Sequence, residues 1–407
     1  MNEHYLLATV AVGNEEAAER SLAELSLLLE TAGGSTDGTV IQNLSHPDPA
    51  TYLGSGKARE LKMMADAYGS DGIVCDDELS PMQLQNLSEI LDLKVLDRTT
   101  LILDIFAAHA NTKEGKIQVE MAQLQYRLSH LKGLGKSLSR LGGGIGTRGP
   151  GETKLETDRR AIHRRIAALS REIEGMKQVR ETTRKKRAQG AFPTAAIVGY
   201  TNAGKSTLLN RITKSDVLVE DKLFATLDPA TRICALPDGE EILFTDTVGF
   251  INKLPHQLID AFRSTLEEAK YADLIIHVVD GADENAALHM EVVYQTLSEL
   301  GISGKPVITL FNKSDLMSSD VRIHDRRAEK DIRISAKSGE GIGEFYTALE
   351  QLLQETRRYV DTVIPYQDGG RLDRIRRYGH LLSEEYEADG IHITAYVPQS
   401  LFRHDGN

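Results

Sequence analysis

Three patterns of hydrophobic and polar positions divide the chain. In residues 1–110, short apolar runs alternate with stretches whose apolar positions recur every three or four residues. This alternation is typical of strands and helices that build a small parallel sheet. The predicted strands are Tyr5–Val12, Gly38–Gln42, Gly72–Cys75 and Lys94–Leu96, and the predicted helices are Glu15–Thr31, Gly56–Tyr68, Pro81–Leu91 and Thr99–Ala110.

Residues 113–188 carry two helical seams on either side of a glycine-rich segment. In each seam the apolar positions step by 4, 3, 4 and 3, as in a coiled coil; they are Ile117, Met121, Leu124, Leu128 and Leu131, then Ile162, Ile166, Leu169, Ile173 and Met176. Between the seams, Leu141–Gly151 contains six glycines in eleven residues. The pattern predicts an antiparallel helical hairpin with arms of about 25 residues, roughly 35–40 Å long.

Strand and helix alternation resumes after Ala191, and a shorter alternating pattern closes the chain at Ile391, Ile393, Ala395 and Val397. We therefore expect four parts: an α/β domain at 1–110, a basic helical hairpin at 111–192, a nucleotide-binding α/β domain at 193–360 and a small α+β domain at 361–407. The predicted fold class is multidomain α/β.

Composition narrows the class of protein. Apolar residues make up 41% and charged residues 27% of 407 residues, a balance typical of globular domains and not of disordered chains. No apolar run reaches the 18 residues that a membrane span needs, and Met1–His4 does not open an export signal. The two cysteines, Cys75 and Cys234, exclude a disulfide framework and a cysteine-based zinc site. We expect a cytoplasmic protein.

Charge is distributed unevenly. Residues 111–190 hold 19 Lys and Arg against 8 Asp and Glu, a net charge of +11, so the other 327 residues carry −23 of the total −12. A basic segment in an acidic protein indicates a polyanionic partner, although a solvated helical face gives the same count. The basic residues near the glycine-rich segment are Lys132, Lys136, Arg140, Arg148, Arg159, Arg160, Arg164 and Arg165.

The glycine-rich segment has two interpretations. It is either a flexible linker or a thin probe that enters a narrow polyanionic crevice, and the two flanking seams favour the probe because a linker seldom interrupts helices that pair. Arg184–Arg187 is likewise either a nucleic-acid patch or a solvated hinge. Gly54-Ser55-Gly56-Lys57 lacks the full phosphate-loop spacing, so a turn that opens a helix is favoured over a second phosphate site.

A complete phosphate loop follows the apolar strand Ala195–Val198. Its spacing, G-x-x-x-x-G-K-S, suits backbone N–H groups that close around phosphate oxygens, a lysine for the outer phosphates and a serine hydroxyl for Mg²⁺. The predicted nucleotide-binding residues here are Gly199, Tyr200, Thr201, Asn202, Ala203, Gly204, Lys205, Ser206 and Thr207.

Guanine is the predicted base. Asn312-Lys313-Ser314-Asp315 follows the apolar strand Pro306–Phe311, at the edge of the sheet where ligands bind in open α/β folds. The Asp315 carboxylate can accept both donors on the guanine N1/N2 edge, Asn312 suits the N7 side, and the Lys313 stem can cover the ring. Ser335, Ala336 and Lys337 follow another strand, Asp331–Ile334, and can present N–H to the guanine O6.

Two switch segments lie between these motifs. Asp246, Thr247, Val248 and Gly249 follow the strand Glu241–Thr245; Asp246 suits the Mg²⁺ shell, and the Gly249 N–H suits the γ-phosphate. Upstream lie Phe224, Ala225, Thr226, Leu227 and Asp228, in which Thr226 is either the second hydroxyl ligand of Mg²⁺ or an ordinary loop residue. The predicted metal ligands are Ser206 and Thr226, and the predicted catalytic groups are Lys205, Thr226 and Gly249.

Phe250 stands where GTPases of the Ras type carry a glutamine that orients the attacking water. A phenyl ring neither donates nor accepts a hydrogen bond in that role. Unaided hydrolysis is therefore expected to be slow, and a bound partner is expected to accelerate it.

These motifs resemble the HflX family of ribosome-associated GTPases. The resemblance rests on G-Y-T-N-A-G-K-S, L-F-A-T-L-D-P-A-T-R (Leu223–Arg232), D-T-V-G-F-I and the glycine-rich segment L-G-G-G-I-G-T-R-G-P-G-E-T-K, and it extends over essentially the whole chain. It implies GTP, GDP and Mg²⁺ as ligands and the 50S subunit, its 23S rRNA and the 70S ribosome as partners. It also implies splitting or rescue of stalled ribosomes, ribosome-stimulated hydrolysis and a secondary ATPase activity. We expect a monomer, and the sequence itself indicates no membrane association.

Three other functions stay open at this point. The first is an ATP-driven RNA-remodelling motor, against which Asp315 argues. The second is a non-catalytic RNA chaperone with a structural nucleotide site. The third is a subunit-assembly factor, because assembly GTPases share the same core and basic extensions.

Overall fold

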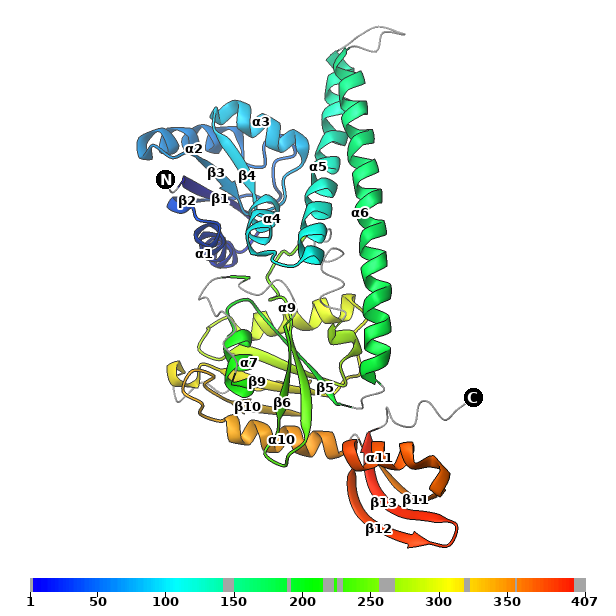
Figure 1. Cartoon of the computed structure of the whole chain (residues 1–407). Helices are drawn as coiled ribbons and strands as arrows, with labels where there is room; N and C mark the ends of the chain where they lie inside the picture. Colours follow the sequence, from blue (N-terminus) through cyan, green and yellow to red (C-terminus); the bar gives the residue numbers. More distant parts are fainter. Residues whose placement is uncertain are drawn as a thin grey trace. The chain divides into compact units, whose positions relative to one another are not determined.

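A computed structural model of the chain describes residues 3–141, 150–188, 192–214, 223–224, 230–255, 268–317, 323–355 and 357–398 (Figure 1). Side chains are described for these residues apart from 132–141, 150–155, 179–188, 358, 377–378, 380 and 398. The chain packs into two compact units. Unit 1 comprises Met1–Glu174, Asp221–Leu227 and Lys253–Phe262, and unit 2 comprises Gly175–Glu220, Asp228–Asn252 and Arg263–Asn407. The four-part division made from the sequence stays a prediction.

Unit 1 contains a parallel four-stranded sheet of order β2-β1-β3-β4. Its elements are β1 (His4–Ala11), α1 (Glu15–Thr31), β2 (Ser35–Asn43), α2 (Ser55–Tyr68), β3 (Gly72–Cys75), α3 (Pro81–Leu91), β4 (Lys94–Asp97) and α4 (Arg98–His109). All eight predicted elements are confirmed, with ends that move by at most three residues. Local chemistry sets several of those ends: Asn14 caps α1, and Ser80 with Gln83 forms a capping box on α3.

The Gly54–Lys57 motif lies where α2 begins. The Gly54 N–H donates to Gln42 Oε1 at 2.8 Å, and the Lys57 ammonium pairs with Glu60 Oε2 at 2.9 Å on the same helix. The first contact reaches back to β2, and the second lies within α2. The motif thus forms the turn that opens α2, as predicted.

A buried ionic network lies at the carboxyl ends of β3 and β4. The Arg98 guanidinium, with its side chain only 2% exposed, donates to Asp76 Oδ1 at 2.9 Å and also to Glu24. Lys253, a further member of unit 1, donates to Asp76 Oδ2 at 2.5 Å and to Asp77 Oδ1 at 2.7 Å. Burial raises the pKa of Asp76, but the charges of Arg98 and Lys253 outweigh it, so the pKa lies below its ordinary value.

The predicted hairpin is present as α5 (Lys113–Leu141) and α6 (Pro150–Ala188). The Arg165 guanidinium contacts the Glu120 carboxylate through two bonds of 2.7 and 2.8 Å, and Ser170 Oγ lies 3.7 Å from Met121 Sδ. Lys113 Nζ also lies 3.9 Å from Glu172 Oε2, so a position seven residues earlier in α5 pairs with one seven residues later in α6, and the two helices are antiparallel. At 29 and 39 residues, the arms are longer than expected because α6 continues through the basic cluster 184–187, which is helical and not a hinge loop. Residues 142–149 of the predicted tip lie outside the described residues.

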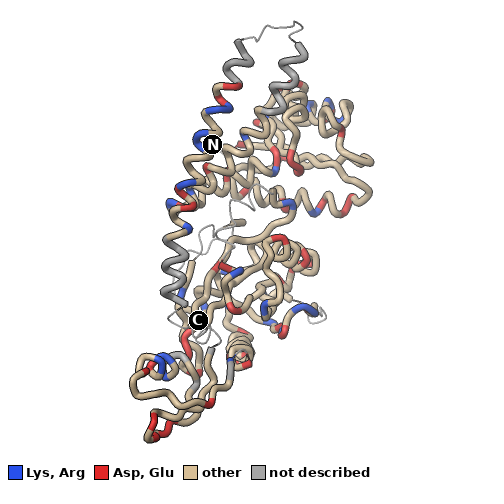
Figure 2. Tube along the Cα trace, turned by 90° about the vertical axis from the view of Figure 1, so that its right-hand side faces the viewer, with Lys and Arg blue, Asp and Glu red and all other residues tan. Residues whose placement is uncertain are grey.

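Basic and acidic residues recur along the described part of α6 (Figure 2). Arg159, Arg160, Arg164 and Arg165 are all exposed. Arg160 pairs with Glu156 at 2.7 Å one turn away, and Arg165 pairs with Glu120. Two of these four arginines are thus paired with carboxylates that the net charge of +11 already includes, and such exposed pairs are weak enough to be exchanged for a polyanionic partner.

Unit 2 is built on a six-stranded sheet of order β10-β9-β8-β5-β7-β6, in which only β6 runs antiparallel to its neighbour. The order reverses on either side of β5, which makes the carboxyl end of that strand the place where ligands bind in open α/β folds. The elements are β5 (Thr194–Gly199), α7 (Lys205–Thr213), β6 (Ala230–Ala235), β7 (Glu241–Asp246), β8 (Leu274–Asp280), α9 (Ala286–Glu299), β9 (Val307–Asn312), η1 (Ser314–Leu316), β10 (Lys330–Arg333) and α10 (Ile342–Glu355).

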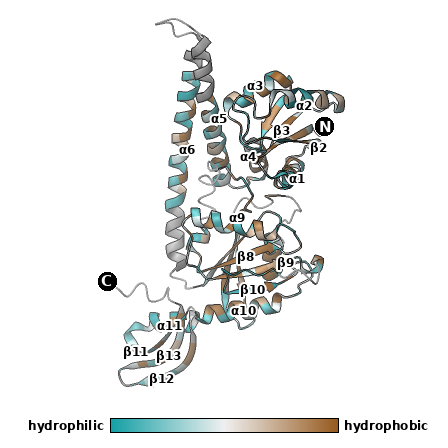
Figure 3. Cartoon of the chain, turned by 180° about the vertical axis from the view of Figure 1, so that it is seen from behind, coloured by the Kyte–Doolittle hydropathy of each residue, from teal (hydrophilic) through white to brown (hydrophobic). Residues whose placement is uncertain are grey.

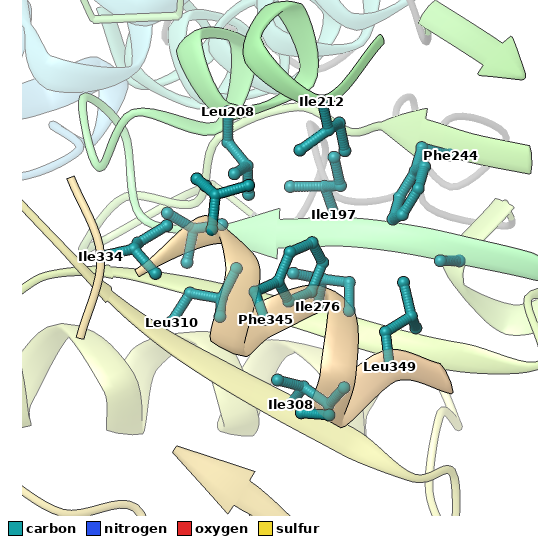
Figure 4. Packing of buried hydrophobic residues seen from close by; sticks show 14 of the residues in the cluster. Ile197, Leu208, Ile212, Phe244, Ile276, Ile308, Leu310, Ile334, Phe345 and Leu349 are labelled. Atoms are coloured by element: carbon teal, nitrogen blue, oxygen red, sulfur yellow. The ribbon is translucent and has the colours of Figure 1, made fainter. Parts of the chain in front are cut away.

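The core of unit 2 forms between this sheet and its helices. Figure 4 shows Phe345 and Leu349 of α10 against strand residues that include Ile276 and Ile308. Central strands such as β8 and β9 are apolar over nearly their whole length (Figure 3), because helices cover parallel strands on both faces. The predicted strands of this domain are confirmed, and this packing fixes the strand ends that carry the site.

A three-stranded antiparallel sheet of order β11-β13-β12 closes unit 2. Its elements are β11 (Arg357–Ile364), η2 (Tyr366–Asp368), α11 (Gly369–Tyr378), β12 (His380–Glu387) and β13 (Gly390–Pro398). The alternating residues predicted in β13 are buried together with Leu372 and Ile375 of α11. Among the described helices, none has the length and apolar character to cross a bilayer. Cys75 and Cys234 are both buried and free.

Candidate nucleotide-binding site

The phosphate loop connects β5 to α7 at the centre of the sheet. A Cβ on Gly199 would lie 2.2 Å from the Val278 carbonyl oxygen, so only glycine lets the loop approach β8 this closely. Gly204 has φ +92°, and a Cβ there would lie 2.2 Å from Asn312 Nδ2. The two motif glycines therefore hold the loop against the strands that carry the rest of the site, and α7 begins directly behind it.

Lys205 is the first residue of α7, and its side chain is buried, with the whole residue 6% exposed. The ammonium donates to the Tyr200 carbonyl oxygen at 2.8 Å, across the loop. Burial lowers the pKa of Lys205 to about 8, and the nearby Asp246 carboxylate opposes that shift. The loop thus presents a desolvated cation, which binds an anion more strongly than a hydrated one.

Ser206 and Asp246 come together from α7 and β7. The Ser206 hydroxyl donates to Asp246 Oδ2 at 2.7 Å, and Asp246 is fully buried. Hydroxyl and carboxylate oxygens are ligand types that suit Mg²⁺, so Ser206 and Asp246 would hold the ion or its bound water at this point. Within the described part of the chain, no cluster of three His, Cys, Asp or Glu offers a rival metal site. Ala225, Thr226, Leu227 and Asp228 lie outside the described residues, so the second hydroxyl ligand stays a prediction.

The D-T-V-G segment runs beside the phosphate loop. The Thr247 hydroxyl donates to the Ile197 carbonyl at 2.7 Å, and the Phe250 N–H donates to the Gly199 carbonyl at 3.1 Å. A Cβ on Gly249 would lie 3.1 Å from Lys205 Nζ, which places Gly249 next to the lysine expected to hold the outer phosphates. Phe250 is buried, at 2% exposure, and offers no polar side-chain atom. Phe224 is also buried.

Asn312 links the phosphate loop to the base-binding segments. Its Nδ2 donates to the Ala203 carbonyl at 2.8 Å, and its Oδ1 accepts the Ala336 N–H at 2.9 Å. This side chain therefore fixes the phosphate loop and the 335–337 loop to the end of β9, a role that the motif alone did not indicate. The Asn312 amide has two N–H groups, and the second can make the predicted contact to the N7 side of guanine.

Lys313 and Asp315 follow β9, at the carboxyl end of the sheet. Lys313 has φ +62°, and its ammonium pairs with Asp280 Oδ2 at 2.7 Å, which fixes the direction of the stem. Asp315 is exposed, and a hydrogen bond from Ser335 lowers the pKa of its carboxyl. Ser314 Oγ donates to Glu340 Oε2 at 3.0 Å. The carboxylate that would receive the guanine edge is thus ionised and accessible.

Arg211 is a residue that sequence reasoning missed. Its Nε donates to the Ala336 carbonyl at 3.0 Å, and its Nη2 donates to the Lys337 carbonyl. These two hydrogen bonds anchor the 335–337 loop to α7, the helix that carries Arg211. No local pattern links an arginine on one helix to a loop 125 residues later, so only the tertiary structure reveals it.

A buried polar network supports β9 from the adjacent strand and helix. Asp325 Oδ2 accepts hydrogen bonds from the hydroxyls of Tyr294 and Thr309, both at 2.6 Å, and His277 Nδ1 lies 3.8 Å away, too far for a hydrogen bond. Burial opposes ionisation of Asp325, but its donors outweigh burial and hold the pKa far below its ordinary value. Burial also lowers the pKa of His277.

This network predicts a dependence of stability on pH. His277 is 1% exposed and neutral when folded, whereas the unfolded chain protonates it below its ordinary pKa of about 6.5. The unfolded state then binds more protons, so the free energy of unfolding should fall as pH drops below about 6.5, by up to about 1.4 kcal/mol per pH unit until the folded pKa is reached. Asp325 adds a further decrease in the free energy of unfolding below about pH 4, because the unfolded chain protonates this carboxyl before the folded chain does.

Denaturant unfolding of the full chain at pH 7.5 and 5.5 tests this expectation. His277→Gln should lose less stability than the unmodified protein between the two values. Equal losses for His277→Gln and the unmodified chain would contradict a neutral buried imidazole.

Four features together define this protein as a P-loop GTPase. They are the sheet order, the buried lysine that follows a glycine-bounded loop, the Ser206–Asp246 pair, and the base-binding segments 312–315 and 335–337 at the carboxyl end of the sheet. Three family descriptions match the chain: a GTP-binding GTPase N-terminal region over 19–107, a GTP-binding GTPase middle region over 109–187 and a 50S ribosome-binding GTPase over 194–313.

Named relatives agree with this class. The GTPase HflX of Lacrimispora saccharolytica is 56% identical over 402 residues, which cover 99% of this chain and 95% of the relative. The GTPase HflX of Escherichia coli K12 is 40% identical over 91% of this chain and 87% of the relative. The chain belongs to the HflX family of GTPases and is a GTP hydrolase, as the motifs indicated.

Among solved structures, a GTP-binding protein from Sulfolobus solfataricus in complex with GDP is 27% identical to this chain. The match covers 86% of this chain and 98% of the other, with a TM-score of 0.46.

Proposed function

We propose that this GTPase binds the 50S ribosomal subunit, is stimulated by it and splits or rescues stalled ribosomes. The observation that carries the proposal is the match of residues 194–313 to a 50S ribosome-binding GTPase, joined in one chain to a basic hairpin. The hairpin has arms of 29 and 39 residues, so at 1.5 Å per residue it reaches on the order of 40 Å or more, enough to enter a crevice in a large RNA.

Phe250 supports the dependence on a partner. Its side chain is buried, and its backbone N–H and carbonyl are both engaged by the phosphate loop, at Gly199 and Thr201. Nothing at this position can orient an attacking water, so that group has to come from elsewhere or from a rearranged switch. A ribosome that supplies or orders it would make hydrolysis conditional on docking.

The remaining assignments complete the proposal. Ser206 and Thr226 would hold Mg²⁺, Lys205 and Gly249 would contact the outer phosphates, and Asp315 would select guanine. The 23S rRNA is the proposed contact of the hairpin, with 70S ribosomes as the particles acted upon. We further propose a cytoplasmic monomer and, in keeping with the family resemblance, a secondary ATPase activity.

Nucleotide turnover with and without purified 50S subunits, with GTP and ATP in parallel, tests the proposal. We expect 50S to raise GTP turnover at least about tenfold, equivalent to about 1.4 kcal/mol of barrier. Binding to 50S should weaken steeply with salt, because phosphate contacts release counterions. Turnover and affinity indifferent to 50S would overturn the proposal.

A hairpin variant separates binding of nucleotide from action on the ribosome. Deletion of Gly142–Gly151 should leave GTP affinity intact and abolish subunit splitting. Splitting that survives the deletion would exclude the probe interpretation. Cofractionation with 70S particles, as opposed to precursor particles, would separate ribosome rescue from subunit assembly.

A further inference from the structure

Tyr200 is the second residue of the phosphate loop, and its side chain contacts two other elements. The ring stacks on the imidazole of His289 in α9, with centroids 3.8 Å apart and an angle of 11° between the planes. The hydroxyl oxygen accepts the backbone N–H of Asn252 at 2.7 Å. Tyr200 is only 7% exposed. We call these three groups, the Tyr200 side chain, the His289 ring and the Asn252 N–H, the Tyr200 clasp.

The clasp acts together with two backbone hydrogen bonds. The Phe250 N–H donates to the Gly199 carbonyl at 3.1 Å, and the Thr201 N–H donates to the Phe250 carbonyl at 2.8 Å, so Tyr200 and Phe250 form a parallel bridge. Residues 250–252 are thereby bound to the phosphate loop as an extension of the β5–β7 pairing. Of the three hydrogen bonds, only the one to Tyr200 depends on a side chain.

The direction of the Tyr200 side chain is fixed at both ends. At its backbone, Gly199 approaches the Val278 carbonyl too closely for any other residue, which holds the start of the loop on β8. At its ring, His289 is held in turn by Asp283, whose Oδ2 lies 3.5 Å from His289 Nδ1. Contacts at both ends therefore hold the Tyr200 side chain in place between the phosphate loop and α9.

Switch segments of GTPases change conformation to contact the γ-phosphate. Gly249, the residue expected to make that contact, is directly followed by the clasped residues, and Phe250 within them is buried. A segment held by three hydrogen bonds has to give some of them up before it can rearrange. We propose that the Tyr200 clasp is an autoinhibitory contact, in which Tyr200 acts as a positioning residue that keeps residues 250–252 in a conformation of low GTPase activity.

This proposal rests on the GTPase activity alone and not on the ribosome as partner. Tyr200→Phe removes the bond to Asn252 and keeps the aromatic stack. Loss of one neutral hydrogen bond shifts such an equilibrium about fivefold. We therefore expect the basal kcat for GTP without ribosomes to rise about fivefold. The KM for GTP and the affinity for GDP should stay within about twofold, because the backbone groups around the phosphates are unchanged.

A second pair of variants tests the stack. His289→Ala removes the support of the Tyr200 ring and should raise kcat in the same direction, whereas His289→Phe keeps a stacking ring and should remain near the unmodified rate. Tyr359→Phe, which removes an exposed phenol hydroxyl in β11, is the matched control and should change nothing.

Amide hydrogen exchange of the GDP-bound protein gives a direct readout. A peptide covering 249–252 should exchange faster in Tyr200→Phe than in the unmodified protein, while peptides from β8 should not change. An unchanged or lower kcat in Tyr200→Phe with GDP affinity retained would overturn the proposal. So would a joint loss of kcat and GDP affinity, which would indicate that Tyr200 only maintains the fold of the loop.

Discussion

Asp315→Asn is expected to weaken GTP binding by about 10³-fold and to confer binding of the xanthine nucleotide. Asp315 lies exposed at the end of β9, and a hydrogen bond from Ser335 lowers the pKa of its carboxyl. A carboxylate accepts both donors of the guanine N1/N2 edge, whereas an asparagine places an N–H against one of them. Sites that hydrogen-bond their ligand reject a mismatched one by large factors, because the site's polar groups are left unpaired.

Xanthine carries an oxygen where guanine carries the amino group, so the asparagine amide matches it again. Titration of fluorescent GDP and xanthosine diphosphate with the purified variant measures the exchange of preference. Asp238→Asn, at an exposed carboxylate in the turn between β6 and β7, should leave both affinities unaltered. Unchanged preference for guanine in Asp315→Asn would show that another group selects the base.

Lys205→Ala is expected to lower the kcat of GTP hydrolysis by at least about 10²-fold. The side chain is buried, and its ammonium lies across the phosphate loop on the Tyr200 carbonyl, 2.8 Å away. A cation held in a desolvated site stabilises charge on the transferring phosphoryl group, and removal of one such preorganised donor typically costs 10² to 10³ in kcat. Nucleotide affinity should fall as well, since the same cation contacts the ground-state phosphates.

Single-turnover hydrolysis at saturating GTP separates these two effects. Lys214→Ala, at the exposed lysine that ends the same helix, is the matched control and should retain both kcat and affinity. Circular dichroism of both variants checks that the fold is retained. A Lys205→Ala protein that keeps its rate at saturating GTP would remove this lysine from the catalytic machinery.

The secondary structure of unit 1 followed from local pattern. Helices such as α1 (Glu15–Thr31) and α3 (Pro81–Leu91) end where predicted, because caps, proline and apolar spacing act within a few residues of one another. The length of a helix does not follow from the sequence where no local signal stops it. A solvated hinge is one interpretation of the basic run 184–187, yet the backbone continues helical to Ala188, since these residues include no glycine or proline.

The network around Arg98 marks where local pattern stops being informative. An arginine is ordinarily exposed, and nothing beside Arg98 in the sequence announces that it is buried against Asp76 and Glu24. Those partners lie 22 and 74 residues away. Their approach depends on the strand order β2-β1-β3-β4, which alternation of strands and helices does not specify.

The class of this protein follows from the sequence alone, because the phosphate loop, the guanine motif and the D-T-V-G segment are each a short run of residues whose spacing carries the chemistry. How those runs are held depends on the folded chain: Asn312 joins two loops, Arg211 holds Ala336, and Tyr200 contacts Asn252 and His289. The difference lies in the range of the interactions. Backbone and side-chain preferences act over a few neighbours, whereas each of these contacts joins residues 24 to 125 positions apart, or more than 50 for the Tyr200 clasp, and exists only once the sheet has set its strand order.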